Sequence, residues 1–439
     1  MFRTTLIILT LCISQINTVT TSTVLTPATD SLRSNQERIE QNILALAQFG
    51  RNKTGGTSRV AFSAADVEGR KFMIKKMQEA GMEVRIDFAG NIIGRRPGKF
   101  NNRKPILFGS HIDTVPDGGN YDGCVGSIGA LEVMEILKEN KVETDHPFEM
   151  IIFSDEEGGL VGSRALIGTL RLDALDLMSH SGKTIEAGIR YIGGDPERLS
   201  EVTLSKDDYK SFLELHIEQG GILDTEGIQI GVVEGIVGIE WWGITIEGFA
   251  NHAGTTPMHM RQDALLAGAK LTVAINEVIN SYKGSQVGTV GRMDVQPSAP
   301  NVIPGKVLMS LEIRDLSQEK IFKLYDDIKE KAKAIAKETD TKISFELLDV
   351  SAVPAITDER IKQIIIQSAE KLKLSYKRMP SGAGHDAQDL AKITPTGMIF
   401  VPSGGGISHS PKEFTSPEDM ANGVNVLLHT LLALDKTDL

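Results

Sequence analysis

The chain has 439 residues, of which 41% are hydrophobic and 24% are charged. A chain of this length and balance is long enough for two domains with cores of their own, and it is too apolar to be disordered. Lysine and arginine total 47 against 58 aspartate and glutamate, and the resulting net charge of -11 argues against nucleic acid or an anionic membrane as the main partner.

The N-terminus has the pattern of a secretory leader. One basic residue, Arg3, precedes an apolar run that is too short to span a bilayer. We therefore expect residues 1–24 to be a signal peptide, the protein to be exported to the periplasm or the medium, and no membrane contact beyond the leader. A buried strand in a cytoplasmic protein is the alternative. Loss of the leader removes Cys12 and leaves Cys124 alone, which excludes an internal disulfide.

After the leader, helical and strand-like patterns alternate along the chain. Helical spacing of apolar residues predicts helices over 34–50, 64–81, 125–138, 358–372 and 417–434. Short apolar runs predict strands over 82–88, 91–94, 106–108, 148–153, 211–220 and 397–401. This alternation is typical of a three-layer α/β domain with a largely parallel or mixed sheet.

Between residues 234 and 351 the expected order of elements changes to βαββαβ. The pattern predicts strands over 240–247, 286–294, 306–316 and 342–350, with helices over 259–283 and 317–337. Such an order is typical of a ferredoxin-like unit, a four-stranded sheet with two helices on one face. We therefore expect a larger domain over 30–233 and 352–439 that is interrupted by a smaller one over 234–351.

Side chains of the metal-ligating types follow the ends of several predicted strands: His111, Asp122, Glu156, Glu157, His216 and His409. In open α/β sheets, ligands bind at the carboxyl edge of the strands. Three histidines and the carboxylates at one such edge predict a two-metal site, in which one carboxylate bridges the ions. This nitrogen and oxygen donor set suits Zn²⁺, Mn²⁺ or Co²⁺. The alternative is a set of unrelated turn and surface residues.

Two acidic features refine this hypothesis. Asp113 could orient the ring of His111 from behind. Asp155, Glu156 and Glu157 follow one strand directly, and three adjacent acids raise one another's pKa unless a positive charge lies among them. A metal site explains the cluster, with Glu157 as a ligand and Glu156 as a general base toward a metal-activated water, whereas a solvated acidic turn is the alternative.

Seven segments, in the same order over nearly all of the chain after the leader, resemble the carbamoylase and allantoate amidohydrolase branch of the M20 metallopeptidase family: GSHIDTVPDGGNYDG, FSDEEG, LELHIEQG, NHAGTTPM, PNVIPG, SGAGHDAQ and ISHSP. The resemblance implies a hydrolase of linear amide C–N bonds, in which a hydroxide between two divalent ions attacks the carbonyl. It implies one ion held by His111, Asp122 and His216, and a second held by Asp122, Glu157 and His409. It also implies Glu156 as the base, and a lid and homodimerisation role for 234–351.

The same resemblance implies further site residues. His252 resembles a lid histidine that stabilises the oxyanion, often across the dimer interface. Substrate contacts are implied for Gln219, Asn301, Arg314, Gly384 and His385. Each has an alternative role: Arg314 as a surface ion pair with Asp315, His252 as a loop cap, His385 as a structural residue.

One difference from the allantoate-specific relatives narrows the choice of substrate. Allantoate-specific relatives resemble one another in carrying arginine at about the position where this chain has Glu240, Trp241 and Trp242. We therefore expect an N-carbamoyl-L-amino acid, whose single carboxylate Arg314 would hold with both arms of its guanidinium. Allantoate or ureidoglycolate is the alternative substrate. A dipeptidase or aminoacylase with the same metals, and an inactive binding protein on the same fold, are alternative functions.

Overall fold

The protein, analysed as a computed structural model, is described over residues 29–206, 208–348 and 352–438. The expected leader, 1–24, lies outside the described residues. Within these ranges, no helix is both long enough and apolar enough to cross a bilayer. Cys124 is buried and free.

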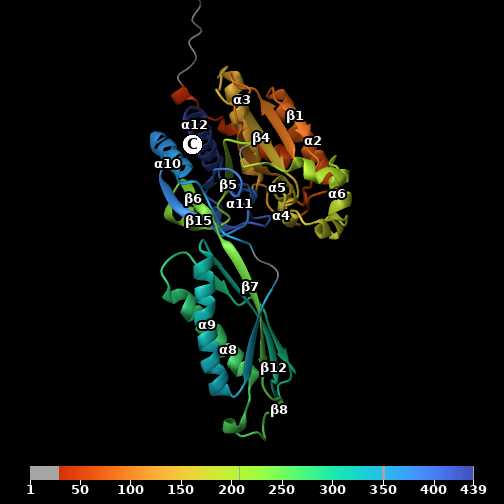
Figure 1. The fold of residues 1–439 in the computed structure, drawn as a ribbon, viewed down its shortest axis with the longest axis vertical. Helices are drawn as coiled ribbons and strands as arrows, with labels where there is room; N and C mark the ends of the chain where they lie inside the picture. Colours follow the sequence, from red (N-terminus) through yellow and green to blue (C-terminus); the bar gives the residue numbers. More distant parts are fainter. Residues whose placement is uncertain (1–28, 207, 349–351, 439) are drawn as a thin grey trace, which may run out of the picture.

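The larger sheet lies in the upper half of Figure 1 and has nine strands in the part of the chain that is described. Its order is β1 (Glu83–Ile86), β2 (Ile92–Arg96), β4 (Phe148–Phe153), β3 (Ile106–His111), β5 (Ser211–Ile217), β16 (Thr396–Val401), β6 (Ile230–Ile236) and β14 (Ala355–Ile356), and β15 (Tyr376–Ser381) also pairs with β6. Strands β4, β3, β5 and β16 are parallel. Every residue in these four strands is buried, as expected for strands that are covered on both faces.

Helices cover both faces of this sheet, so the predicted three-layer α/β fold is confirmed. One face packs in a common core with α1 (Gln36–Leu46), α2 (Ala64–Glu79), α3 (Cys124–Glu139), α10 (Glu359–Lys371) and α12 (Pro417–Lys436). The other packs with α5 (Val161–Leu166), α7 (Ile222–Glu226), α11 (Asp386–Leu390) and the 3₁₀ segment Pro196–Val202. The short helices α4 (Glu156–Gly159) and α6 (Ile185–Tyr191) lie nearby.

The smaller sheet, in the lower half of Figure 1, has its own core. Its antiparallel order is β10 (Met293–Gln296), β12 (Lys306–Asp315), β7 (Gly238–Glu247) and β13 (Lys342–Leu347), and β9 (Val287–Thr289) pairs with β12. Helices α8 (Ala264–Ser281) and α9 (Gln318–Thr339) pack on one face. A two-stranded ribbon of β8 (Asn251–His252) and β11 (Val302–Ile303) lies at its far end.

One strand that the pattern predicts as continuous is divided in the structure. The expected strand 286–294 appears as β9 and β10, and both pair with β12. Thr289 is opposite Glu312, whereas Met293 is opposite Met309, so four residue steps match three on the partner. This extra residue is the signature of a β-bulge, which interrupts pairing without changing the strand's neighbour.

The change from one sheet to the other occurs at Val237. Strand β6 runs to Ile236 in the larger sheet, and β7 begins at Gly238 in the smaller one. Residues 235–239 around this junction are apolar or glycine, without the proline, asparagine, aspartate or serine that would mark a turn. The assignment of 234–351 as a lid and dimerisation domain stays a prediction.

Candidate metal centre

The parallel strands bring the expected ligands to one edge of the larger sheet. His111 is the last residue of β3, and His216 is the penultimate residue of β5. Glu156 and Glu157 begin α4 directly after β4, and His409 lies in the loop after β16. The carboxyl ends of parallel neighbours meet at the same edge, and this is why residues so far apart in the sequence are close together here.

Gly123 allows the loop before α3 to pass close to His111. Its φ is +62°, and an added Cβ would lie 2.4 Å from Nε2 of His111. Only glycine fits this left-handed conformation and this close approach without strain. The preceding residue, Asp122, is thereby held beside the histidine rings.

Asp122 lies between two groups of donor atoms. Its Oδ1 is 3.5 Å from Nε2 of His111 and 3.2 Å from Nε2 of His216. Its Oδ2 is 3.3 Å from Nε2 of His409, which is itself 3.5 Å from Oε2 of Glu157. Within each group of three ligands, the donor atoms lie within 4.8 Å of one another. The two groups share Asp122, which corresponds to a bridging carboxylate.

Backbone carbonyls set the orientation of two of the rings. Nδ1 of His111 lies 3.1 Å from the carbonyl oxygen of Asp113, and Nδ1 of His216 lies 2.9 Å from that of Ile217. Because a carbonyl only accepts, each Nδ1 carries the hydrogen and each Nε2 faces Asp122. This is the tautomer in which a histidine ligates a metal through Nε2.

The carboxylate of Asp113 contacts α4. Its Oδ2 accepts a hydrogen bond of 3.1 Å from the amide of Glu157, and its Oδ1 lies 3.4 Å from the amide nitrogen of Glu156. Oδ1 of this carboxylate is 3.7 Å from Nδ1 of His111. The ring is therefore held by the Asp113 carbonyl, while the Asp113 side chain positions the two glutamates.

The site contains more negative charge than its own groups can compensate. Burial, together with the neighbouring Asp122, raises the pKa of Glu157 to about 7. The hydrogen bond to Asp122 raises the pKa of His409 to about 9. Burial opposes protonation of His111, but the carboxylates around it outweigh burial and raise its pKa well above the ordinary value.

Two buried atoms that could ligate a metal ion have no hydrogen-bond partner among the described residues. They are Nε2 of His111 and Oε1 of Glu157. Within the described part of the chain, Asp122, Glu156 and Glu157 form ion pairs with histidines and with no lysine or arginine. Two groups of nitrogen and oxygen donors with a shared carboxylate match the requirements of two divalent cations.

Glu156 lies beside the two donor groups without belonging to either of them. Its Oε2 is 3.6 Å from Nε2 of His111. Burial raises the pKa of Glu156 well above its ordinary value, and the negative charges of Asp386 and Glu157 add to the rise. A buried carboxyl group with a raised pKa, next to candidate metal ligands, has the environment of a general acid and base.

Three polar side chains surround the bridging carboxylate. Gln219 donates from Nε2 to Oδ2 of Asp122 at 2.6 Å, and Ser408 donates to the same oxygen at 3.0 Å. Glu413 accepts from the amides of Tyr121 and Asp122 at 2.8 and 3.0 Å. Gln219 is an expected site residue, but Glu413 was missed, because a single glutamate in a loop carries no recognisable signal.

His385 lies beside His216, with 4.5 Å between ring centroids, and Gly384 precedes it at the start of α11. His385 and His216 also form a third donor group with Glu214. Glu214 accepts from Ser110 Oγ at 2.7 Å and from the amide of Ala387 at 3.1 Å. Because both Glu214 oxygens accept hydrogen bonds, Glu214 is occupied in joining β5 to β3 and α11.

Arg314 links the smaller sheet to the rim of the centre. Its Nη1 donates to the carbonyl of Gly382 at 2.8 Å, and its Nε donates to Glu312 at 2.6 Å. Its alternative partner, Asp315, instead binds Lys320 at 2.8 Å. Gly382 belongs to the loop that leads to His385, so Arg314 lies at the edge of the site within the same chain.

His252 and Asn301 lie elsewhere. His252 is exposed in β8, at the lower tip of Figure 1. Asn301 lies beside it, because its carbonyl accepts a hydrogen bond from the amide of Ala253, the residue after His252. The tip is at the opposite end of the smaller sheet from the metal centre. One chain therefore brings together all expected metal ligands with Glu156, Asp113, Gln219 and His385. Gly384 and Arg314 are connected to this group through the loop 382–385, whereas His252 and Asn301 lie apart from it.

The sequence is similar to known proteins over most of its length. A profile of the peptidase family M20/M25/M40 matches residues 107–433. The N-carbamoyl-L-amino acid amidohydrolase of Geobacillus stearothermophilus is 39% identical over 403 residues, which cover 91% of this chain and 98% of that protein. The ureidoglycolate hydrolase of Arabidopsis thaliana is 38% identical over 417 residues, 92% of this chain and 87% of that protein.

The fold is also similar to that of solved structures. An amidase of the hydantoinase/carbamoylase family from Burkholderia multivorans superimposes with a TM-score of 0.87 at 33% identity, and the match covers 93% of this chain and 100% of that one. The similarity thus extends over both sheets, and it confirms the resemblance drawn from the seven sequence segments.

Proposed function

Because the chain belongs to the peptidase family M20/M25/M40 and is a hydrolase of carbon–nitrogen bonds in linear amides, we propose that it hydrolyses an N-carbamoyl-L-amino acid with the help of two divalent metal ions. The observation that carries this proposal is the position of Asp122, shared by two groups of metal-ligand type with Glu156 beside them. An inactive binding protein would have no need of a buried glutamate at that position.

The residues in each group define the proposed metal ligands. His111 and His216 with Asp122 would hold one ion, and Glu157 and His409 with Asp122 would hold the other. When bound, such ions polarise a carbonyl oxygen and lower the pKa of water. Zn²⁺, Mn²⁺ and Co²⁺ all suit these donors.

The proton transfers are assigned to Glu156. As a carboxylate it takes a proton from the attacking water while the new C–O bond forms at the ureido carbon, and it then delivers that proton to the leaving α-amino nitrogen as the C–N bond breaks. Its raised pKa supports this cycle, because the group must hold a proton between the two steps. Asp113 keeps Glu156 and Glu157 in place through their backbone amides.

The surroundings of Arg314 support the choice of substrate. In the register of the smaller sheet, Trp241 is opposite Glu312, and it shares the open face of the sheet with Arg314. Glu240 is buried on the helix side, where Gln318 donates to it. This part of the strand thus presents an indole on the same face as Arg314 instead of a second cation, which suits a substrate with one carboxylate and an apolar side chain.

We propose that His252 and Asn301 act in the partner of a homodimer. Both lie at the tip of the smaller sheet, away from the metal centre of their own chain. Phe249, Met258 and Met260 near this tip are 62%, 74% and 66% exposed. Large exposed apolar side chains beside expected substrate-binding residues are typical of an interface.

A substrate panel tests the proposal. Protein loaded in turn with Zn²⁺, Mn²⁺ and Co²⁺ is given N-carbamoyl-L- and N-carbamoyl-D-amino acids, allantoate, ureidoglycolate, dipeptides and N-acetyl amino acids, and the release of ammonia or amine is measured. We expect the highest kcat/KM for an N-carbamoyl-L-amino acid. A higher kcat/KM for dipeptides would favour the dipeptidase alternative, and a metal-loaded protein inactive on the whole panel would favour the binding protein.

Ureidoglycolate is the second candidate substrate. The relative from Arabidopsis thaliana is named for it and is nearly as similar as the N-carbamoyl-L-amino acid amidohydrolase. Both compounds carry one carboxylate next to a ureido group, so Arg314 would serve either. Competition between the two in one assay decides which has the larger kcat/KM.

We further propose that the protein acts outside the cytoplasm. The N-terminal apolar run supports export. Expression of the full chain in a bacterial host, followed by fractionation and N-terminal sequencing, tests this. Recovery of the uncleaved chain in the cytoplasmic fraction would contradict export.

A further inference from the structure

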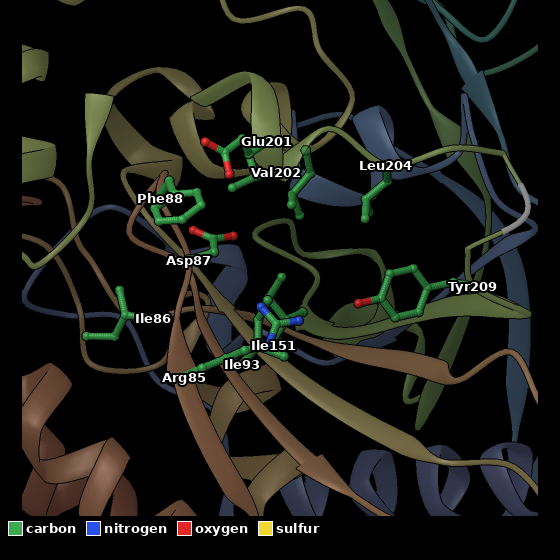
Figure 2. A pocket seen from close by; sticks show the side chains of 11 residues that line it. Arg85, Ile86, Asp87, Phe88, Ile93, Ile151, Glu201, Val202, Leu204 and Tyr209 are labelled. Atoms are coloured by element: carbon green, nitrogen blue, oxygen red, sulfur yellow. The ribbon is translucent and has the colours of Figure 1, made fainter. Parts of the chain in front are cut away.

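A second cavity, of about 330 Å³, lies on the face of the larger sheet that carries α5, away from α3 and α12. Figure 2 shows it from close by, with strands below and the segment around Val202 above. Its apolar lining includes Ile93, Ile151, Leu166, Val202 and Leu204. None of its lining residues belongs to the groups of candidate metal ligands.

One wall of this cavity carries an incompletely compensated guanidinium, that of Arg85. The Glu149 carboxylate lies 3.8 Å from Nη2 of Arg85, but it also pairs with Arg95 and accepts from the Tyr209 hydroxyl at 2.7 Å. Figure 2 shows the Tyr209 hydroxyl pointing toward the Arg85 guanidinium. Two guanidinium groups share one carboxylate here, so positive charge remains available to an anion in the cavity.

A carboxylate with neutral partners lies on the same wall. Asp87 accepts hydrogen bonds of 2.9 and 2.8 Å from the amides of Ala89 and Asn91, and one of 2.8 Å from the Asn91 side chain. Among the described residues, no lysine or arginine is within ion-pair distance of Asp87. The carboxylate is buried, and burial raises its pKa. A cation in the cavity would therefore gain by lying beside Asp87.

The cavity thus combines a guanidinium, two carboxylates and an apolar lining, and the second carboxylate, Glu201, is already paired with Arg198. We propose that it binds a free α-amino acid with an apolar side chain. The ligand's carboxylate pairs with Arg85, its ammonium group pairs with Asp87, and its side chain packs on Ile93 and Ile151. A volume of about 330 Å³ is at the lower end of the range of about 300 to 1,000 Å³ for small-molecule sites, which suits a ligand of this size.

This binding site is independent of the metal ions and of the proposed reaction, although the proposed reaction releases a compound of the same class. L-Leucine binding to the full chain is measured by isothermal titration calorimetry with chelator present. Arg85→Gln removes the charge at a position whose side chain is 56% exposed, and Leu204→Trp fills the cavity at a half-buried position. Arg360→Gln, on α10 at the opposite face of the larger sheet, makes the same charge change at a side chain that is also 56% exposed.

We expect Arg85→Gln to weaken L-leucine binding by about ten-fold or more, because the carboxylate of the ligand loses its charged hydrogen-bond partner. Leu204→Trp should abolish binding, and Arg360→Gln should leave it unchanged. Arg314→Ala, which alters the expected substrate site, should also leave it unchanged. Binding that persists in both Arg85→Gln and Leu204→Trp, or that is lost in Arg314→Ala, would overturn the proposal, as would a wild-type chain that takes up no leucine.

Two leucine analogues test recognition of both charges. 4-Methylpentanoate lacks the ammonium group, and 3-methylbutylamine lacks the carboxylate. Each should bind about ten-fold more weakly than L-leucine, because each leaves one charged wall group without its partner. Equal binding of either analogue would overturn the assignment of an amino acid. Activity on N-carbamoyl substrates, measured separately in Arg85→Gln, should equal that of the wild type.

Discussion

The backbone amide of Glu157 donates to Oδ2 of Asp113 across 3.1 Å, and the two residues are 44 positions apart in the sequence. Asp113 is buried in the loop after β3, and Glu157 is the second residue of α4, the short helix that follows β4. This hydrogen bond joins the carboxyl ends of two neighbouring strands at the point where the expected base and a metal ligand leave the sheet.

Asp113 is therefore expected to act as a positioning residue. Asp113→Ala removes the acceptor for both amides, and we expect kcat to fall by about 100-fold, as is typical when groups that hold metal-site ligands are lost. Asp113→Asn retains one acceptor oxygen and should lose less, about ten-fold. Steady-state kinetics with metal analysis checks this. An unchanged kcat in Asp113→Ala would show that the glutamates are held by other contacts.

Glu156 provides the most direct test of the reaction. Glu156→Gln keeps the size of the side chain but cannot take up a proton, so we expect kcat to fall by about 10²- to 10⁴-fold. Metal content and melting temperature should stay close to those of the wild type, because Glu156 belongs to neither donor group. Near-normal turnover in this variant would refute its role as the base.

Removal of metal should lower stability as well as activity. A chelator should abolish turnover and lower the melting temperature by about 5 to 10 °C, and Zn²⁺ or Mn²⁺ should restore both, because an ion that binds only the folded state stabilises it. Differential scanning calorimetry with and without chelator measures the shift. A chelated protein with full activity would exclude a metal-dependent mechanism.

The metal-free protein should become less stable as pH rises from about 6 to 9. Burial raises the pKa of Glu157 to about 7, and the bond to Asp122 raises that of His409 to about 9. A group whose pKa is raised on folding contributes stability below its unfolded pKa, and this contribution is lost as pH rises through the folded value. Melting curves of chelated and metal-loaded protein check this, and a metal-free protein more stable at pH 9 than at pH 6 would contradict it.

Arg314 should control the affinity for substrates with a carboxylate. Arg314→Ala should raise KM by about 10- to 100-fold, as expected for the loss of a charged hydrogen-bonded pair. Arg314→Lys should recover only part of the affinity, because an ammonium group cannot grip a carboxylate with two parallel donors. Kinetics with an N-carbamoyl-L-amino acid and with its carboxamide distinguish a loss of carboxylate binding from a general effect on the site. Equal KM changes for both compounds would remove Arg314 from carboxylate binding.

The placement of His252 predicts complementation between inactive chains. Glu156→Gln and His252→Ala should each have low activity as pure dimers. If His252 acts in the partner's site, random mixing of equal amounts should restore about a quarter of wild-type activity, because half of the dimers are mixed and each mixed dimer has one intact site. Chains that are unfolded together and refolded before assay provide the measurement. No recovery would place His252 within its own subunit.

The sequence was sufficient to predict which residue types meet at the metal centre. His111, His216 and Glu157 each lie at or just after the end of a parallel strand, and strand ends that follow apolar runs are visible in a single sequence. Parallel neighbours align these ends by geometry, so a local pattern carries long-range information. The three-layer fold was predictable for the same reason.

Contacts that depend on side-chain direction were decided only by the tertiary structure. Glu413 binds the amide of Asp122 from 291 positions away, and no periodic pattern marks it. The Asp113 carboxylate serves α4 instead of the His111 ring because packing sets its direction. His252 lies in the β8–β11 ribbon at the far end of the smaller sheet, and this position keeps it away from the centre of its own chain. Local propensity specifies strands and turns, whereas the meeting of distant loops depends on how the complete core packs.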